Sequence, residues 1–145
     1  MSRYEIFAEP VSEHSEISGK IEDNLLSALS TINEQSLNST IVLSARGSDG
    51  KFVGGVSGST SYGWFLVKLL WVHSSMRETG IGTSLMLASE AQAKTFGCHH
   101  AWLDTSNAQA HKFYQRLGYS IFGMLNNEGN NEPVEHKRWF MKKEL

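Results

Sequence analysis

The chain has 145 residues, of which 40% are hydrophobic and 19% are charged. This composition argues against intrinsic disorder, which needs low hydrophobicity and high net charge, and the length suits one domain with its own core. The formal net charge is −2 and the chain has no basic stripe, so nucleic acid and anionic membranes are disfavoured as partners. We therefore expect residues 1–145 to form a single domain.

The cysteine content and the N-terminus indicate the compartment. Cys98 is the single cysteine, so it forms no internal disulfide and supplies no thiolate-rich metal site by itself. The N-terminal residues lack the long apolar run of a signal peptide, and no stretch approaches the ~18 apolar residues of a membrane span. These features predict a cytoplasmic protein.

The N-terminal half predicts one helix among several strands. An apolar stripe at helical spacing from Ile17 to Ile32 predicts the helix, with an end within residues 33–38. Runs of β-forming or alternating residues predict strands at 4–8, 40–45, 51–57 and 62–73. The last run is mostly apolar and is expected to be covered on both faces. The segment 58–61 is expected to separate it from the preceding strand.

The C-terminal half alternates between helices and strands. A helix is predicted over 80–96, and a second one is predicted between Gly118 and a capping box formed by Ser106 and Gln109. The predicted strands are 100–105, 119–125 and 137–142. Following the earlier strands, this alternation predicts a mixed α/β architecture built largely on a single sheet.

The segment from Leu69 to Leu85 has the properties of an anion-binding device. An apolar strand runs through a turn containing Arg77 into a helix whose first residues include Gly80 and Gly82. A helix N-terminus offers unpaired amides and partial positive charge, glycine lets a phosphate approach the backbone, and arginine adds a charge-assisted hydrogen bond. No lysine follows Gly82 as in a nucleotide-hydrolysing P-loop, and the dinucleotide fingerprint fails at Leu85. Alone, the pattern leaves a phosphate site and a structural turn equally open.

Two motifs about thirty residues apart resemble a known family. Arg77-x-x-Gly80-x-Gly82 after an apolar strand resembles the pyrophosphate-binding motif of the GNAT superfamily, the Gcn5-related N-acetyltransferases. The run 103–119, with Asn107 before a Phe-Tyr helix that ends in Leu-Gly-Tyr, is similar to the second half of that superfamily. The resemblance covers the chain from about residue 40 onward. It implies an α/β (α+β) GNAT fold whose mixed central sheet is splayed between two strands, with helices on both faces.

The resemblance implies acetyl-coenzyme A (acetyl-CoA) as cosubstrate, with no metal. The backbone of Leu70 and Val72 would hydrogen-bond the pantetheine arm like an added strand. The pyrophosphate would lie beside Arg77, on the amides around Glu78, Thr79, Gly80, Ile81, Gly82 and Thr83. The family motif often has glycine where this chain has Glu78, and a carboxylate there would lower phosphate affinity somewhat.

Two residues of the second motif carry expected roles. Tyr114 matches the family's tyrosine, which implies a general acid that protonates the departing coenzyme A thiolate. The alternative for Tyr114 is a core aromatic residue beside Phe113. Asn107 would reach the pantetheine amide or a bound water, and its alternative is an ordinary residue at a helix start.

The acceptor implied by the resemblance is a primary amine of a small molecule or protein, which attacks directly in a ternary complex. Neutralising a lysine-like amine at pH 7 costs ~4.6 kcal/mol, so a base is expected. Some GNAT enzymes carry a glutamate on the central strand, but residues 65–68 include no carboxylate. A water relay or another side chain would then act. His73 is the candidate base by residue type, and its alternative is a solvent-exposed turn histidine. Asp104 would orient a water or, as we favour, cap the helix of Asn107.

Other features are weaker. Cys98, His99 and His100 make a poor metal chelate because adjacent strand residues point to opposite faces. The acidic segment 126–135, with Glu128, Glu132 and Glu135, faces a cationic acceptor or is simply a solvated loop. The aromatic residues Tyr62, Trp64 and Trp71 line an acceptor pocket, form a subunit contact or belong to the sheet core.

Two functions of different classes remain open. The first is an acetyl-CoA-dependent N-acetyltransferase. The second is a non-catalytic acyl-CoA-binding or assembly module of the same fold, which the missing strand carboxylate favours slightly and the retained Tyr114 and Asn107 oppose. Because dimers are common in the superfamily, the resemblance also admits a homodimer.

Overall fold

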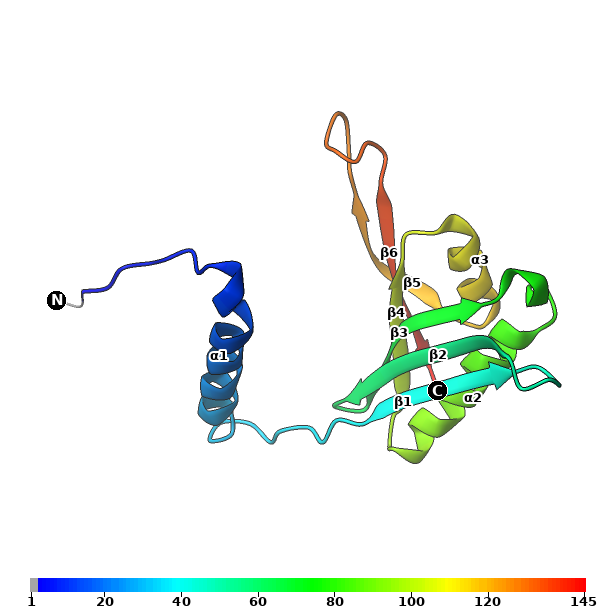
Figure 1. Ribbon diagram of the computed structural model, residues 1–145, viewed down its shortest axis with the longest axis horizontal. Helices are drawn as coiled ribbons and strands as arrows, with labels where there is room; N and C mark the ends of the chain where they lie inside the picture. The colour runs from blue at the N-terminus through cyan, green and yellow to red at the C-terminus, as the bar shows by residue number, and fades with distance from the viewer. Residues whose placement is uncertain (1–2) are drawn as a thin grey trace. The chain divides into compact units, whose positions relative to one another are not determined.

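The structure, a computed structural model, describes residues 3–145 and divides into two compact units, residues 1–36 and 37–145 (Figure 1). The first unit holds a 3-10 turn, η1 (Val11–Glu13), and the predicted helix, α1 (His14–Leu29). Residues 4–8 form neither helix nor strand, so the strand predicted there is wrong. A strand needs a hydrogen-bonded neighbour, and the alternating pattern alone does not supply one. The single domain expected over residues 1–145 stays a prediction.

The second unit is a six-stranded sheet with two α-helices. Its elements are β1 (Thr40–Arg46), β2 (Phe52–Ser61), β3 (Trp64–Val72), η2 (Ser74–Met76), α2 (Ile81–Thr95), β4 (His100–Thr105), α3 (Ala108–Arg116), β5 (Ser120–Asn126) and β6 (Lys137–Glu144). The strand order is β1-β2-β3-β4-β6-β5, and only the β3–β4 pair is parallel. The mixed α/β sheet predicted from the sequence is confirmed.

The sheet opens between its two parallel strands. β3 pairs with β4 only from Trp64 opposite His100 to Leu66 opposite Trp102. Beyond that point β3 continues to Val72 and β4 to Thr105 with no further pair, and Figure 1 shows the two strands diverging. The predicted splay is therefore confirmed, and it lies at the carboxyl ends of β3 and β4.

β3 contains a β-bulge just where it leaves β4. Ser57 of β2 lies opposite Leu69 and Gly58 lies opposite Val67, so Lys68 is an extra residue in β3. A Cβ on Gly58 would overlap the carbonyl oxygen of Leu66, so only glycine fits there without displacement of the backbone. The expectation that residues 58–61 interrupt the strand is wrong, because β2 runs through them to Ser61.

Both helices of this unit pack on one face of the sheet, named here the helical face. Along β6, Trp139 stacks on His111 of α3 and Lys143 pairs with Glu90 of α2. These two strand residues are four apart, so their side chains share a face. The opposite face is named the far face. A helix on the far face, expected from the resemblance, stays a prediction.

The core lies between the sheet and α2. Its largest fully buried side chains include Phe65, Met86, Leu103 and Met141. On the far face beyond the bulge, however, Leu69 is 70% exposed and Trp71 45% exposed, so β3 is covered on both faces only as far as Val67. Across residues 3–145, no helix combines the length and apolar character needed to cross a bilayer.

Candidate active site

The first turn of α2 presents unpaired amides. Its first intrahelical hydrogen bond runs from the Ser84 amide to the Gly80 carbonyl at 2.9 Å, so the amides of residues 81–83 have no intrahelical acceptor. No side chain caps this end, because the N-cap residue is Gly80 in the left-handed region, at φ 87°. An uncapped helix start with partial positive charge is suited to bind an anion.

The loop before α2 is curled by two left-handed residues, Glu78 at φ 65° and Gly80. The backbone at Glu78 explains why glycine is usual at this place in the motif, since only glycine adopts this conformation without strain. The Thr79 hydroxyl donates to the Met76 carbonyl and ties the loop to η2.

A groove of about 550 Å³ runs from this helix start to α3. Nine of the predicted site residues line it: Leu70, Val72, Arg77, Glu78, Gly80, Gly82, Thr83, Asn107 and Tyr114. Thr79 and Ile81 lie elsewhere, on a neighbouring hollow formed with β1 and the outer side of α2. The groove thus brings the glycine turn and Tyr114 together.

The backbone of β3 faces this groove at the predicted positions. The His73 amide donates to the Val53 carbonyl of β2 at 2.7 Å, so alternation directs the amides and carbonyls of Leu70 and Val72 away from β2. The Val72 carbonyl accepts from Nε of Arg77 at 3.4 Å, which agrees with that direction. An extended ligand arm can pair with this edge, because β4 has already diverged.

Tyr114 borders the groove from α3 and is 8% exposed. Its ring packs edge-on against Phe113 at 5.2 Å and Tyr119 at 5.9 Å between centroids. Its hydroxyl has no hydrogen-bond partner among residues 3–145. Burial raises the pKa of Tyr114, so the phenol keeps its proton at neutral pH and is able to donate it.

Beneath Tyr114 lies a buried network that the sequence patterns missed. Glu90 of α2 is 5% exposed and accepts hydrogen bonds from the Tyr119 hydroxyl at 2.8 Å and from Lys143 Nζ at 2.6 Å. Burial and the charge of Glu90 both raise the pKa of Tyr119. A detectable signal was present, since Glu90 follows Met86 by four residues and precedes Ala93 by three on the inward face of α2.

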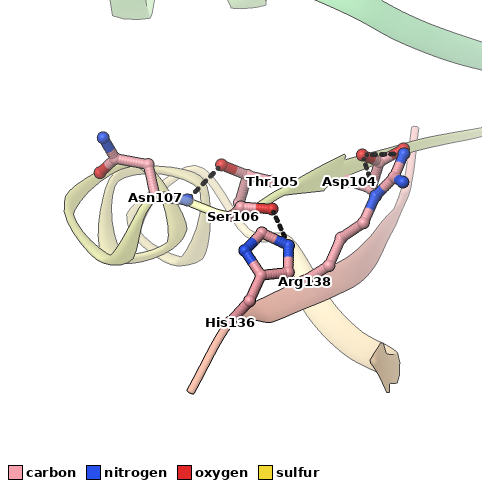
Figure 2. A network of polar contacts seen from close by, with 6 residues as sticks. All are labelled: Asp104, Thr105, Ser106, Asn107, His136 and Arg138. Atoms are coloured by element: carbon pink, nitrogen blue, oxygen red, sulfur yellow. Dashed lines mark hydrogen bonds and ion pairs between the residues drawn. The ribbon is translucent and has the colours of Figure 1, made fainter. Parts of the chain in front are cut away.

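The helix start of α3 corrects two predictions. Asn107 is the N-cap, and its Oδ1 accepts from the amides of Gln109 at 2.8 Å and Ala110 at 3.0 Å. The cap predicted at Ser106 is therefore wrong by one residue. Asp104 does not cap the helix either, because its side chain lies on the far face and pairs with Arg138 at 2.8 Å (Figure 2). Asn107 thus fits its alternative as a helix-start residue, with its amide nitrogen still free to meet a ligand in the groove.

Of the remaining candidates, Trp71 borders the groove and the others lie outside it. His73 is exposed, and its Nδ1 accepts from the Ser75 amide at 3.1 Å, which matches the turn histidine. The His100 ring stacks on the Trp64 ring, with 4.5 Å between their centroids. Residues 3–145 contain no group of three or more His, Cys, Asp or Glu side chains placed to hold a metal. Trp71 stacks on Phe52 on the far face. The acidic loop 126–135 is mostly exposed.

A mixed sheet that opens between two parallel strands, with an uncapped helix start at the opening and a buried tyrosine opposite, defines an α/β protein of the acetyltransferase class. The chain belongs to the acetyltransferase (GNAT) family, whose model matches residues 4–119.

Three proteins illustrate the similarity. Acetyltransferase Atu2258 of Agrobacterium fabrum is 38% identical over 93 residues, which is 64% of this chain and 65% of that protein. The blasticidin-S acetyltransferase of Streptomyces morookaense is 34% identical over 113 residues, 66% of this chain and 83% of that protein. An acetyltransferase crystal structure from Bacillus cereus superimposes with a TM-score of 0.79 at 28% identity over 98% of both chains. The chain spans slightly less than two thirds of the Agrobacterium fabrum relative.

Proposed function

We propose that the protein is an acetyl-CoA-dependent N-acetyltransferase that transfers the acetyl group to a primary amine of a small molecule or protein. The amine attacks directly, in a ternary complex. The observation that carries the proposal is the single groove bordered at one end by the unpaired amides of α2 and along α3 by the protonated phenol of Tyr114.

Each side of the groove contacts a different part of the cosubstrate. The amides of residues 81–83 hold the diphosphate, with Arg77 beside it, and the edge of β3 at Leu70 and Val72 pairs with the pantetheine arm. The neutral amine nitrogen then forms a bond to the thioester carbon, the carbon–sulfur bond breaks, and the nitrogen loses one proton to solvent as the amide forms. The Tyr114 proton goes to the departing sulfur, and the phenolate regains a proton from solvent.

The test measures free thiol released from acetyl-CoA against a panel of amines. The panel includes blasticidin S, because a relative 34% identical to this chain is named for it. Turnover by the wild type, with kcat lowered about 10²-fold or more in Tyr114→Phe and acetyl-CoA binding retained by calorimetry, supports the proposal. Tight binding without turnover on any amine supports the binding module instead, and absence of binding contradicts both.

The role of Arg77 is tested by the choice of thioester. Arg77→Met is expected to weaken acetyl-CoA binding about tenfold, since a charge-assisted contact to the diphosphate is lost. Acetyl-pantetheine lacks the diphosphate, so its affinity should be the same for the variant and the wild type. An equal loss for both thioesters would mean that Arg77 acts through the Val72 carbonyl and not through phosphate.

A further inference from the structure

A second set of polar groups lies on the far face at the carboxyl end of β4, between β4 and β6 (Figure 2). Ser106, the residue after β4, has its Oγ 3.4 Å from Nε2 of His136, the residue before β6. Asp104, two residues before Ser106, forms its ion pair with Arg138, two residues after His136. Both Ser106 and His136 are exposed, so a ligand entering from solvent can reach them.

The place of His136 relative to the groove follows from strand alternation. Asn107 lines the groove on the helical face, whereas Asp104 and Ser106, two residues apart, lie with Arg138 and His136 on the far face. Figure 2 shows the Asn107 side chain directed away from His136. His136 therefore stands across the end of β4 from the groove, on the β6 side of that strand.

This placement matches the path of an acceptor. The proposed cosubstrate fills the groove on the helical face, so an amine that attacks its carbonyl carbon has to come through the gap from the far face. On one side this gap is bordered by the end of β4, and His136 is the histidine that contacts that end, through Ser106.

Other bases are already committed or badly placed. Asp104 is held by Arg138 at 2.8 Å, so its carboxylate already has a cationic partner. His73 is bound to Ser75 outside the groove, and β3 has no carboxylate at residues 65–68. The contact of His136 with Ser106 is long, at 3.4 Å, so the ring can exchange that contact for a substrate.

We propose that His136 is the general base that takes a proton from the acceptor's ammonium group, with Ser106 positioning its ring. This inference rests on the proposed function. The ammonium gives one proton to the imidazole and becomes a neutral amine, which then attacks the thioester carbon. The nitrogen loses its second proton to solvent as the amide forms, while the sulfur leaves with the proton of Tyr114. One proton is released to solvent in each turnover once the imidazole has discharged.

The pH dependence separates this role from a structural one. The charged groups on the elements that meet there are Asp104 on β4, Arg138 and Lys137 on β6, and Glu135 beside His136. Without a base, only the amine fraction that is already neutral reacts, and this fraction rises with pH toward the ordinary amine pKa of ~10.4. The deficit of His136→Gln in kcat/KM should thus be about 10²-fold at pH 7 and shrink steadily at higher pH.

The experiment compares His136→Gln with His14→Gln, which alters an exposed histidine whose ring nitrogen contacts the Glu9 carbonyl. Both variants should bind acetyl-CoA like the wild type in a calorimetric titration, and only His136→Gln should show the pH-dependent deficit. Added imidazole should restore part of the activity of His136→Ala. Ser106→Ala should show a smaller deficit with the same pH trend, which Ser106→Thr relieves.

The outcomes separate this inference from the proposed function. An active wild type with His136→Gln equally active at pH 7, or with a deficit that is constant across pH, overturns the role of His136 and leaves the acetyltransferase in place. A wild type that is inactive on every amine overturns the proposed function, and the role of His136 with it.

Discussion

The hydroxyl of Tyr119 donates a hydrogen bond of 2.8 Å to the carboxylate of Glu90. This contact joins the end of the α3 segment to the middle of α2, directly beside the ring of Tyr114. Lys143 on β6 completes the charge balance of the buried glutamate. The position of the proposed acid therefore depends on a polar network that no catalytic role requires.

Glu90→Ala is expected to lower the free energy of unfolding by about 3 kcal/mol, because the half-buried Lys143 ammonium and the buried Tyr119 phenol lose their shared partner. Urea denaturation measures this. The double variant Glu90→Leu with Lys143→Met removes both charges and should recover most of the loss. If that double variant is as unstable as Glu90→Ala, packing and not the unpaired charge explains the effect.

Stability should fall in alkali. Burial raises the pKa of both Tyr114 and Tyr119, so the folded chain keeps phenol protons that the unfolded chain releases near pH 10. The folded state then binds more protons, and the free energy of unfolding decreases as pH rises above ~10, by up to ~1.4 kcal/mol per pH unit for each tyrosine. Tyr119→Phe should flatten this slope between pH 9 and 11.5. Tyr4→Phe, which alters an exposed ring, should not.

Glu78→Gly should strengthen acetyl-CoA binding. The substitution relieves a left-handed residue and removes a carboxylate from the groove, so we expect affinity to rise about threefold to tenfold. Thermal unfolding without ligand should change little, because the relief of strain is offset by the greater chain entropy of glycine. Glu78→Gln separates charge from strain: if it gains nothing, the carboxylate does not oppose binding.

The capping role of Asn107 can be separated from the cosubstrate contact that we propose for it. Asn107→Ala removes the cap of α3 and should cost about 1 kcal/mol of stability, whereas Asn107→Asp keeps an oxygen acceptor for the Gln109 and Ala110 amides. If the amide nitrogen of Asn107 also contacts the cosubstrate, Asn107→Asp should weaken acetyl-CoA binding while unfolding is unchanged. Equal affinities for Asn107→Asp and the wild type would limit this residue to capping.

The two glycines of the motif should respond differently to alanine. At Gly80 a Cβ meets open space but φ is 87°, so Gly80→Ala should cost about 1 kcal/mol of stability. At Gly82 the backbone is helical, but a Cβ would lie 3.3 Å from Cζ of Phe113 and 3.7 Å from Cγ2 of Val72. Gly82→Ala should therefore retain stability yet weaken acetyl-CoA binding about tenfold, as measured by calorimetry, because the methyl group narrows the groove.

The sequence was most informative where chemistry is local. β4 was predicted residue for residue, and the start of α2 to within one residue, because glycine and a change of hydrophobic period mark these boundaries. The strand at residues 4–8 and the break at 58–61 failed for the opposite reason, since strand pairing is set by partners distant in the chain.

The site was predictable to the same extent. The lining of the groove followed from two motifs, but the pairing of Asp104 with Arg138 and the meeting of Ser106 with His136 join residues thirty or more positions apart. Only the antiparallel registration of β4 with β6 reveals these pairs.

The β-bulge at Lys68 also sets which face each later residue of β3 occupies. Val67 and Leu70 both turn inward, on either side of the bulge. If β3 instead kept a regular alternation through Lys68, each residue from Leu69 to Val72 would turn to the opposite face. The indole of Trp71 would then point into the groove that we propose for the pantetheine arm, and the aliphatic Leu70 would face outward. Absorbing one residue in a bulge thus determines which side of the strand lines the groove and which forms the outer surface.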